Sequence, residues 1–515
     1  MRIGIDVGGT NTDAVLMDGV KVAGSVKRST RENVTDGIKD ALESLREATG
    51  FDPSAIEGVM IGTTHFINAL IEANRLAPTA AVRLCLPATA ALPPLTAWPN
   101  GLTEAISGRS YMVSGGHEFD GREIAALDVD QIKQAAADMG NAGIRSVAIT
   151  SVFSPVNHEF EEKAAEILAD ELPGIAVSLS NRIGRVGLLE RENATIINAA
   201  LRELAEQVVD GLVAVLDELG INAPLFLTQN DGTLMSVDVV RQYPVSTFAS
   251  GPTNSMRGAA ALTGLTDCAV VDVGGTTSDI GVLRNGFPRE ANTAVEVAGV
   301  RTNFRMPDVV SIGIGGGSRV HENGSVVGPD SSGYRLTSEA LVFGGDTLTA
   351  TDIAVAAGRV EIGDPSLVAH LDKSMVQRGL EYIAQQSAAL IDSLRTSPDP
   401  MPVVAVGGGS ILLPDHLEGI GSVSHPENHS VANAVGAAIS QVSGEVDRIF
   451  PIGPGERRKV IDQAMEEAAS KATAAGALEE TVQIVEVDEV PIPYLPGNAS
   501  RVRVKAVGEL GHRSR

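Results

Sequence analysis

Two stretches of the sequence decide its fold: Asp6-Val7-Gly8-Gly9-Thr10-Asn11-Thr12-Asp13 and Asp272-Val273-Gly274-Gly275-Thr276-Thr277-Ser278-Asp279. Six of their eight positions are identical, and each copy stands between two apolar runs. An apolar strand, a Gly-Gly turn and a second apolar strand are typical of a β-hairpin. Because the hairpin occurs twice in one chain, the sequence predicts two homologous lobes.

The rest of the chain alternates between helical and strand patterns, which indicates an α/β fold. Apolar spacing predicts helices over 35–48, 129–139, 158–168 and 189–219, and strands over 146–150 and 175–179. A further helix over 456–475 and strands over 482–490 and 501–506 predict a small C-terminal α+β appendage. The length of 515 residues exceeds what one core usually holds. We expect three units: 1–188, 189–444 and 445–515.

The charge balance and the apolar runs exclude several classes of protein. The chain has 65 acidic and 40 basic side chains, a formal net charge of −25, which excludes a general nucleic-acid binder. Its two cysteines cannot form a disulfide framework. No apolar run reaches the roughly 18 residues of a membrane helix, and no export signal precedes the first strand. We therefore expect a cytoplasmic protein that binds neither nucleic acid nor membrane.

The hairpin turns predict a clamp for phosphate groups. Their glycines let backbone N–H groups turn inward, and their hydroxyls add further donors, so together they form a nest for anionic oxygens. The predicted phosphate-binding residues are Gly8, Gly9, Thr10, Asn11, Gly274, Gly275, Thr276 and Thr277. A simple β-turn is the alternative for either copy alone, but two copies favour the clamp.

Carboxylates flank both turns, and a bare phosphate would repel them. We therefore assign catalytic roles to Asp6, Asp13, Asp272 and Asp279. These groups either bind Mg²⁺, through water, or orient a nucleophile. Asp6 and Asp272 are the predicted metal residues.

Two more glycine clusters follow apolar segments. Gly407, Gly408, Gly409 and Ser410 end a strand, and bare backbone there lets a base or ribose approach. A second cluster contains Gly315, Gly316, Gly317 and Ser318. This cluster is either a structural turn or an oxyanion nest on the substrate side, and we favour the nest.

Polar residues elsewhere suggest a substrate side. Thr63, Thr64, His65 and Asn68 follow the strand 59–61, and His65 is a candidate proton shuttle because imidazole titrates near neutrality. A local hydrogen-bonding role is the alternative for this histidine. Arg191 precedes a long predicted helix and is either an anion clamp or a first-turn charge.

The hairpins and the Gly407 to Ser410 cluster resemble the two phosphate loops and the adenosine loop of the actin, sugar-kinase and heat-shock-chaperone ATPase superfamily. Five further segments resemble the hydantoinase A / 5-oxoprolinase branch of it: Gly62-Thr63-Thr64, Glu190 to Thr195, Ser250-Gly251-Pro252, Leu348 to Asp352 and Tyr494 to Ala499. The resemblance implies duplicated actin-like (ribonuclease H-like) lobes around a nucleotide cleft, with ATP and Mg²⁺ bound there.

For activity, the resemblance implies ATP-dependent opening of a cyclic amide such as a hydantoin, 5-oxoproline or another lactam. Larger members of the family use a second, hydantoinase B-like subunit or a fused second half, so this chain acts either with such a partner or alone, and a homo-oligomer is expected. Three alternatives stay open: a small-molecule kinase, an ATP-dependent carboxylase subunit, and an ATP-gated scaffold that is not an enzyme.

Overall fold

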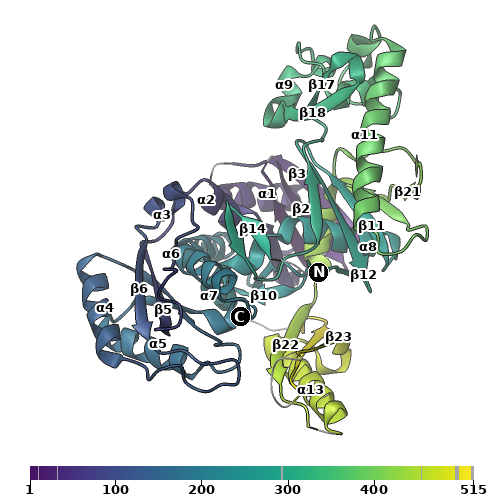
Figure 1. Cartoon of the computed structure of the whole chain (residues 1–515). Helices are drawn as coiled ribbons and strands as arrows, with labels where there is room; N and C mark the ends of the chain where they lie inside the picture. The colour runs from purple at the N-terminus through teal and green to yellow at the C-terminus, as the bar shows by residue number, and fades with distance from the viewer. Residues whose placement is uncertain (10, 32, 292–293, 454, 493–497, 512–515) are drawn as a thin grey trace.

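The computed structural model describes residues 1–515 except 10, 32, 292–293, 454, 493–497 and 512–515. Among the described residues, two mixed sheets form the two lobes and a third, parallel sheet forms a separate layer. The parallel unit lies at the lower left of Figure 1, and the tip of the second lobe, with α9 (Leu336–Glu339) and β17 (Ser318–His321), lies at the top.

The first lobe is built on a nine-stranded sheet, counted over the described residues, in the order β23-β24-β22-β10-β9-β4-β1-β2-β3. Its strands are β1 (Arg2–Val7), β2 (Asn11–Asp18), β3 (Lys21–Ser29), β4 (Gly58–Thr63), β9 (Leu225–Thr228), β10 (Leu234–Ser236), β22 (Val442–Phe450), β23 (Gln483–Pro491) and β24 (Ser500–Gly508). Its helices are α1 (Val34–Thr49), α2 (His65–Ile71), α6 (Leu188–Glu218), α7 (Val237–Gln242) and α13 (Arg457–Ala475).

The second lobe is built on the order β13-β12-β11-β19-β21-β20, with β16 paired to β12. Its strands are β11 (Cys268–Val273), β12 (Ser278–Arg284), β13 (Phe287–Pro288), β16 (Val309–Ile312), β19 (Val403–Val406), β20 (His416–Leu417) and β21 (Gly421–Ser424). The hairpin of β17 with β18 (Val326–Ser331) and the helices α10 (Ala350–Ala356) and α11 (Lys373–Leu394) complete it. The hairpin of β14 (Val295–Val297) with β15 (Val300–Thr302) packs instead on the core of the first lobe.

The parallel unit follows the order β6-β5-β7-β8. It consists of β5 (Thr79–Leu86), β6 (Arg109–Ser114), β7 (Ser146–Ser151), β8 (Ala176–Leu179), α3 (Asn100–Ala105), α4 (Val129–Asn141) and α5 (Glu159–Glu171). Buried apolar side chains from its strands and from α4 and α5 form a core of their own. The helices predicted over 129–139 and 158–168 and the strands predicted over 146–150 and 175–179 are therefore confirmed.

The two lobes repeat one topology, which confirms the predicted duplication. In the first, β1 pairs antiparallel with β2 and parallel with β4, and β4 pairs parallel with β9. In the second, β11 pairs antiparallel with β12 and parallel with β19, and β19 pairs parallel with β21. The same alternation of antiparallel and parallel neighbours is built on each hairpin.

Helices α8 (Ser250–Thr263) and α12 (Ala432–Ile439) join the lobes through backbone contact. A Cβ at Gly258 would lie 1.8 Å from the carbonyl oxygen of Ala432, and one at Gly436 would lie 1.8 Å from that of Asn254. Any side chain at either glycine would push the two helices apart. The two glycines therefore bring polar side chains of α8 and α12 to both hairpins.

Two of the expected boundaries do not coincide with the limits of the sheets. The helix predicted to begin near residue 189 begins at Leu188, but β9 and β10 follow it and join the first sheet, so the first lobe does not end at 188. The limit at 444/445 cuts through β22, which continues the same sheet through the Leu234 to Val442 pair. The C-terminal α+β unit exists as predicted, with α13, β23 and β24, but it extends the first lobe.

Of the helices that the structure describes, none combines the length and the apolar character that a bilayer crossing requires.

Candidate functional site

The two hairpin turns have the same hydrogen-bonded form. Gly8 N–H donates to the carbonyl of Asn11 at 3.0 Å, and Gly274 N–H donates to that of Thr277 at 2.9 Å. Asp6 pairs with Asp13 across one hairpin and Asp272 with Asp279 across the other. Gly9, Thr276 and Thr277 are exposed at the turn tips, where a ligand can reach them, and Thr10 lies outside the described residues.

Consecutive residues of α8 hold one carboxylate from each lobe. Asn254 Nδ2 donates to Asp6 Oδ1 at 3.0 Å, and Ser255 Oγ donates to Asp272 Oδ2 at 2.5 Å. From α12, Asn433 Nδ2 donates to Asp6 Oδ2 at 3.1 Å and to Asp13 Oδ2 at 3.0 Å. The predicted carboxylates therefore form one cluster that spans both lobes.

A lysine provides positive charge in this cluster. Lys27, on β3, lies opposite Asp13 in the strand register, and its Nζ lies 2.5 Å from Asp13 Oδ1. Its charge also favours the ionised forms of Asp6 and Asp272, which opposes part of the rise in their pKa values caused by burial. Since the side chain is about 38% exposed, its ammonium group can also reach an incoming anion.

Burial changes the protonation of the carboxylates. It raises the pKa of Asp6 to about 6, although the amides of Asn254 and Asn433 lower it. It raises the pKa of Asp272 to about 7, with further increases from the charges of Asp279 and Asp6. Burial also raises the pKa of Asp279. The cluster therefore holds more negative charge than its surroundings stabilise, which is the environment that a bound cation would relieve.

Glycines leave room for the two central carboxylates. A Cβ at Gly62 on β4 would lie 2.4 Å from Asp6 Oδ1, and one at Gly407 would lie 2.4 Å from Asp272 Oδ1. Gly407 also has a φ of +84°, which side-chain-bearing residues rarely adopt. In both lobes, the strand parallel to the hairpin thus contributes a glycine beside the aspartate.

The Gly407 to Ser410 cluster packs on the second hairpin. Gly409 N–H donates to the carbonyl of Val273 at 2.8 Å, and Ser410 Oγ lies 2.9 Å from His429 Nδ1. Gly408 is exposed, and a Cβ built on it meets no atom within 4 Å. The loop thus presents open backbone beside the hairpin, as the predicted adenosine contact requires.

The cluster from Gly315 to Ser318 does not form the oxyanion nest that we favoured. Gly316 and Gly317 donate their N–H groups to the carbonyls of Gly274 and Gly275, at 3.0 and 2.7 Å. Gly315 donates its N–H to Ser318 Oγ, and Ser318 donates its N–H to the carbonyl of Gly315. Because all four amides are used internally, the loop supports the second hairpin turn, which is the structural alternative.

Arg191 is also not an anion clamp. Its side chain is fully buried in α6, and its guanidinium donates to carbonyls of Ser151, Arg185, Val186 and Gly187. These bonds leave no exposed face for a ligand. Arg191 instead joins the end of β7 to the start of α6.

The polar group after β4 lies beside the first hairpin. Thr64 Oγ1 donates to the carbonyl of Val7 at 3.4 Å, and Asn68 Nδ2 donates to Thr64 Oγ1 at 3.3 Å. Thr63 N–H donates to Ser250 Oγ at 3.2 Å. These contacts place Thr63, Thr64 and Asn68 between the hairpin and α8, where a substrate role stays a prediction.

His65 begins α2 and faces Arg75. Arg75 Nη1 lies 3.0 Å from His65 Nε2, and since arginine only donates, this ring nitrogen is the acceptor. Burial, with the charge of Arg75, lowers the pKa of His65, so the ring is neutral near pH 7. Its acceptor nitrogen is already bonded, and this geometry gives no support to a proton shuttle.

The donor set fits Mg²⁺ held through water. Among the described residues, no group of three or more acidic, histidine or cysteine side chains is arranged to hold a metal directly. Both Asp6 oxygens accept amide hydrogen bonds, which favours contact with a metal through its water ligands. Mg²⁺ commonly keeps several waters and binds through one or two carboxylates and substrate phosphates.

Sequence reasoning missed the groups that hold the carboxylates, namely Asn254, Ser255, Asn433 and Lys27. The first two lie two and three residues after the Ser250-Gly251-Pro252 segment, and Asn433 is the second residue of α12, in its run of small residues. These neighbouring motifs were the available signal. Nothing in the sequence around Lys27 marks it, since only the register of β3 brings it to Asp13.

Two lobes that repeat the hairpin sheet, joined by crossed helices, define a duplicated actin-like ATPase fold. The comparisons with known proteins then identify the group within it. Residues 2–172 match the model of the hydantoinase/oxoprolinase N-terminal region, and residues 191–394 match that of hydantoinase/oxoprolinase. The chain belongs to the hydantoinase/oxoprolinase family.

Curated relatives are longer than this chain. The chain is 28% identical over 396 residues to the caprolactamase subunit alpha of Pseudomonas jessenii, which covers 70% of the chain and 55% of that protein. It is 24% identical over 280 residues to the acetone carboxylase beta subunit of Xanthobacter autotrophicus, covering 52% of the chain and 37% of that protein. The chain thus spans about a third to three fifths of the length of the curated relatives it matches.

Solved structures show the same fold over the whole chain. The ATP-dependent caprolactamase from Pseudomonas jessenii matches with a TM-score of 0.76 and 19% identity, covering 99% of this chain and 88% of that one. Nucleotide-free acetone carboxylase matches with a TM-score of 0.66 and 16% identity, over the same shares of the two chains. At these identities the likeness is one of fold.

Proposed function

We propose that this chain uses ATP to activate the carbonyl oxygen of a cyclic amide of the hydantoin, 5-oxoproline or lactam type, so that water can open the ring. One observation carries the nucleotide part of the proposal: consecutive residues of α8 hold a hairpin carboxylate from each lobe. Two glycine turns and a shared acidic cluster are what a polyphosphate and its metal require.

The chain's own groups take distinct roles. The exposed turns at Gly9 and Thr276 donate to phosphate oxygens, and the open backbone at Gly408 lies against the adenosine. Lys27 moves from Asp13 toward a phosphate oxygen as the anion enters. Asp272, with a pKa of about 7, is the base that orients and deprotonates an attacking oxygen.

Mg²⁺, when bound with ATP, neutralises the phosphate charge that the aspartates would otherwise repel. Asp6 and Asp272 would hold its water ligands, an arrangement that lets both Asp6 oxygens keep their amide hydrogen bonds.

The chemistry explains why such an enzyme needs ATP. A lactam carbonyl is a poor electrophile, and a phosphoryl group on its oxygen turns that oxygen into a leaving group. Water then adds to the carbon, and the C–N bond breaks with its electron pair going to the nitrogen, which leaves an acyl phosphate. A second water hydrolyses the acyl phosphate to the carboxylate and inorganic phosphate. The products are phosphate, ADP and a ring-opened acid, which carries a freed amine when the substrate is a lactam or 5-oxoproline and a carbamoyl group when it is a hydantoin.

Family membership and the 28% identity to a caprolactamase subunit support the cyclic amide. That relative is named as one subunit of its enzyme, so we propose that this chain acts either alone or with a second, hydantoinase B-like subunit. A homo-oligomer is part of the same proposal.

The test is phosphate release from MgATP by the purified chain, with and without the candidate second subunit. Caprolactam, 5-oxoproline, hydantoin and N-methylhydantoin form the panel. We expect one of them to stimulate release, with an equal amount of ring-opened product. Stoichiometric formation of a stable phosphorylated compound would indicate a kinase, and nucleotide-dependent assembly without stimulation would indicate a scaffold.

A carboxylase subunit is the second candidate, since the acetone carboxylase beta and acetophenone carboxylase gamma subunits are also relatives. Both reactions begin by activating a carbonyl oxygen, so the same acidic cluster would serve either. Acetone or acetophenone with bicarbonate in the same assay separates the two: stimulation by the ketone and none by the cyclic amides favours the carboxylase.

A further inference from the structure

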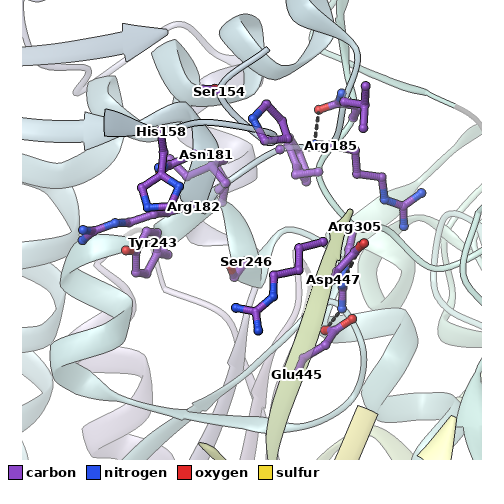
Figure 2. Close-up of a pocket in the computed structure, with 18 of the residues that line it drawn as sticks. Ser154, His158, Asn181, Arg182, Arg185, Tyr243, Ser246, Arg305, Glu445 and Asp447 are labelled. Carbon is purple, nitrogen blue, oxygen red and sulfur yellow. Dashed lines mark hydrogen bonds and ion pairs between the residues drawn. The ribbon is translucent and has the colours of Figure 1, made fainter. Parts of the chain in front are cut away.

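A large cavity lies away from the hairpins. It has a volume of about 640 Å³ and opens between the end of the parallel unit, α7, the 303–305 segment and β22 (Figure 2). None of the hairpin carboxylates is among its described lining residues. Its volume falls within the range of small-molecule sites, roughly 300 to 1,000 Å³. The function proposed above does not use it.

The lining carries both signs of charge. Six Arg or Lys side chains and four Asp or Glu side chains face it, in a chain where acidic residues outnumber basic ones. Apolar walls such as Ile183, Val245 and Phe304 stand between them. A purely anionic ligand would meet the acids, and a purely cationic one would meet the more numerous bases. A molecule with one charge of each sign suits the mixture.

The deep charges already satisfy one another. Asp447 lies 3.0 Å from Arg305 Nη2 and accepts from Arg501 Nε at 2.7 Å. Arg305 also pairs with Glu445. This network joins β22 and β24 to the 303–305 segment and forms the wall seen at the right of Figure 2. It therefore shapes the cavity, and other groups must bind the ligand.

Three groups on the segment 181–185 have unused hydrogen-bonding capacity. Asn181 Oδ1 and Arg185 Nε are buried and have no hydrogen-bond partner among the described residues, while Arg185 Nη2 pairs with Glu290 at 3.0 Å. Arg182 is about 54% exposed, and Glu162 lies at 3.6 Å from it. Buried polar atoms are almost always paired, so an orphaned acceptor and an orphaned donor in one cavity point to a missing partner that has both.

We propose that this cavity binds a small zwitterionic amino carboxylic acid, the ring-opened product of the cyclic amide. Its carboxylate accepts from Arg182 and from the unpaired Nε of Arg185, and its ammonium group donates to Asn181 Oδ1 and to the acidic side of the lining. The inference rests on the proposed function for the identity of the ligand. The geometry of the cavity is independent of it.

The cavity wall and the acidic cluster share one short segment of chain. Asn230, in the lining, accepts from Ala249 N–H through Oδ1 at 2.8 Å. Thr253 Oγ1, on the first turn of α8, donates to the carbonyl of Gln229 at 3.2 Å, and the next residue is the Asn254 that holds Asp6. The cavity is thus attached to the same helix as the reaction site.

The test is calorimetric titration of the full chain, without nucleotide or cyclic amide, with 6-aminohexanoate and with L-glutamate. These are the products that caprolactam and 5-oxoproline would give. Hexanoate and hexylamine carry one charge each and serve as matched probes. We expect at least one zwitterion to bind, and to bind at least tenfold more tightly than either single-charge probe. Equal binding of hexanoate would overturn the zwitterion, and no binding of either amino acid would overturn the site.

Variants locate the site. Asn181→Leu removes the orphaned acceptor, Arg182→Gln removes an exposed charge with little risk to folding, and both should weaken binding at least tenfold. Arg109→Gln is the matched control. Arg109 lies on β6, outside the cavity lining, is also about half exposed, and pairs with Asp138 at 3.2 Å. Wild-type affinity in both cavity variants would refute the placement.

Phosphate release is measured separately on the same preparations. Binding without lactam-stimulated release would contradict the proposed function and leave the cavity site standing. Lactam-stimulated release without binding of either amino acid would contradict the cavity site and support the proposed function.

Discussion

Replacing Asp272 with Asn should remove catalysis and stabilise the protein in alkaline solution. Burial and two neighbouring aspartates raise the pKa of this carboxyl from 3.8 to about 7. The folded state therefore binds the proton more tightly than the unfolded state. The resulting stability is fully present below pH 3.8 and is lost as the pH rises through about 7.

The pKa values set the size of the effect. The pKa values of Asp272 in the unfolded and folded states, 3.8 and about 7, differ by about three units, and each unit corresponds to about 1.4 kcal/mol. The ionised carboxylate therefore lowers the free energy of unfolding by up to about 4 kcal/mol at pH 8. At pH 5 the same linkage costs about 1 to 2 kcal/mol. Asn carries no charge at either pH, and its side-chain oxygen can still accept from Ser255 Oγ.

Differential scanning calorimetry at pH 5 and pH 8 measures this difference. We expect the Asp272→Asn variant to unfold about 3 to 4 °C above wild type at pH 8, and by less than half of that margin at pH 5. Substrate-stimulated phosphate release should fall at least about a hundredfold, as expected for loss of a base. The exposed carboxylate in Asp346→Asn provides the control, with no pH-dependent gain.

Two results would refute the reasoning. An unchanged or lower midpoint at pH 8 would mean that the carboxylate is not destabilised by its burial. Wild-type phosphate release from the folded variant would remove Asp272 from the proposed chemistry.

Substitutions at two glycines should have different effects on stability. Gly436→Ala places a Cβ 1.8 Å from the carbonyl oxygen of Asn254 and should lower the unfolding midpoint by several degrees. Gly408→Val has open space at its Cβ, so it should keep the midpoint and weaken ATP binding, measured by calorimetry, at least tenfold. A stable Gly436→Ala variant would contradict the close helix contact. Lys27→Gln should raise the KM for MgATP at least tenfold and Lys27→Arg should restore part of the affinity, since only the charge is needed beside Asp13. Equal KM values would show that Lys27 serves the hairpin alone.

The local features of the fold could be read from the sequence. The hairpins were predictable because strand, turn and strand are contiguous and glycine marks the turn. The helix predicted over 35–48 spans Val34–Thr49, since the Asn33 cap at its start and Gly50 at its end are single-residue signals. The duplicated carboxylates could likewise be assigned to one site, because the repeat itself implied symmetry.

What failed depends on contacts between distant parts of the chain. The end of the first lobe could not be predicted because Leu234 pairs with Val442, more than 200 residues later. The role of Arg191 depends on the carbonyl of Ser151, on another element. The cluster at Gly316 has the composition of a nest, and only its position against Gly274 shows that its amides are used.

The order of strands in the first sheet has a consequence for how the chain is made. Strand β24 lies between β22 and β23, and β22 adjoins β10, so residues 500–508 complete a sheet that begins at Arg2. The described strands of the second sheet all lie within residues 268–424. During synthesis the second lobe can therefore fold before β23 and β24 of the first sheet have been made. A nascent chain stalled before residue 500 would expose β22, an unpaired edge that invites association with other chains.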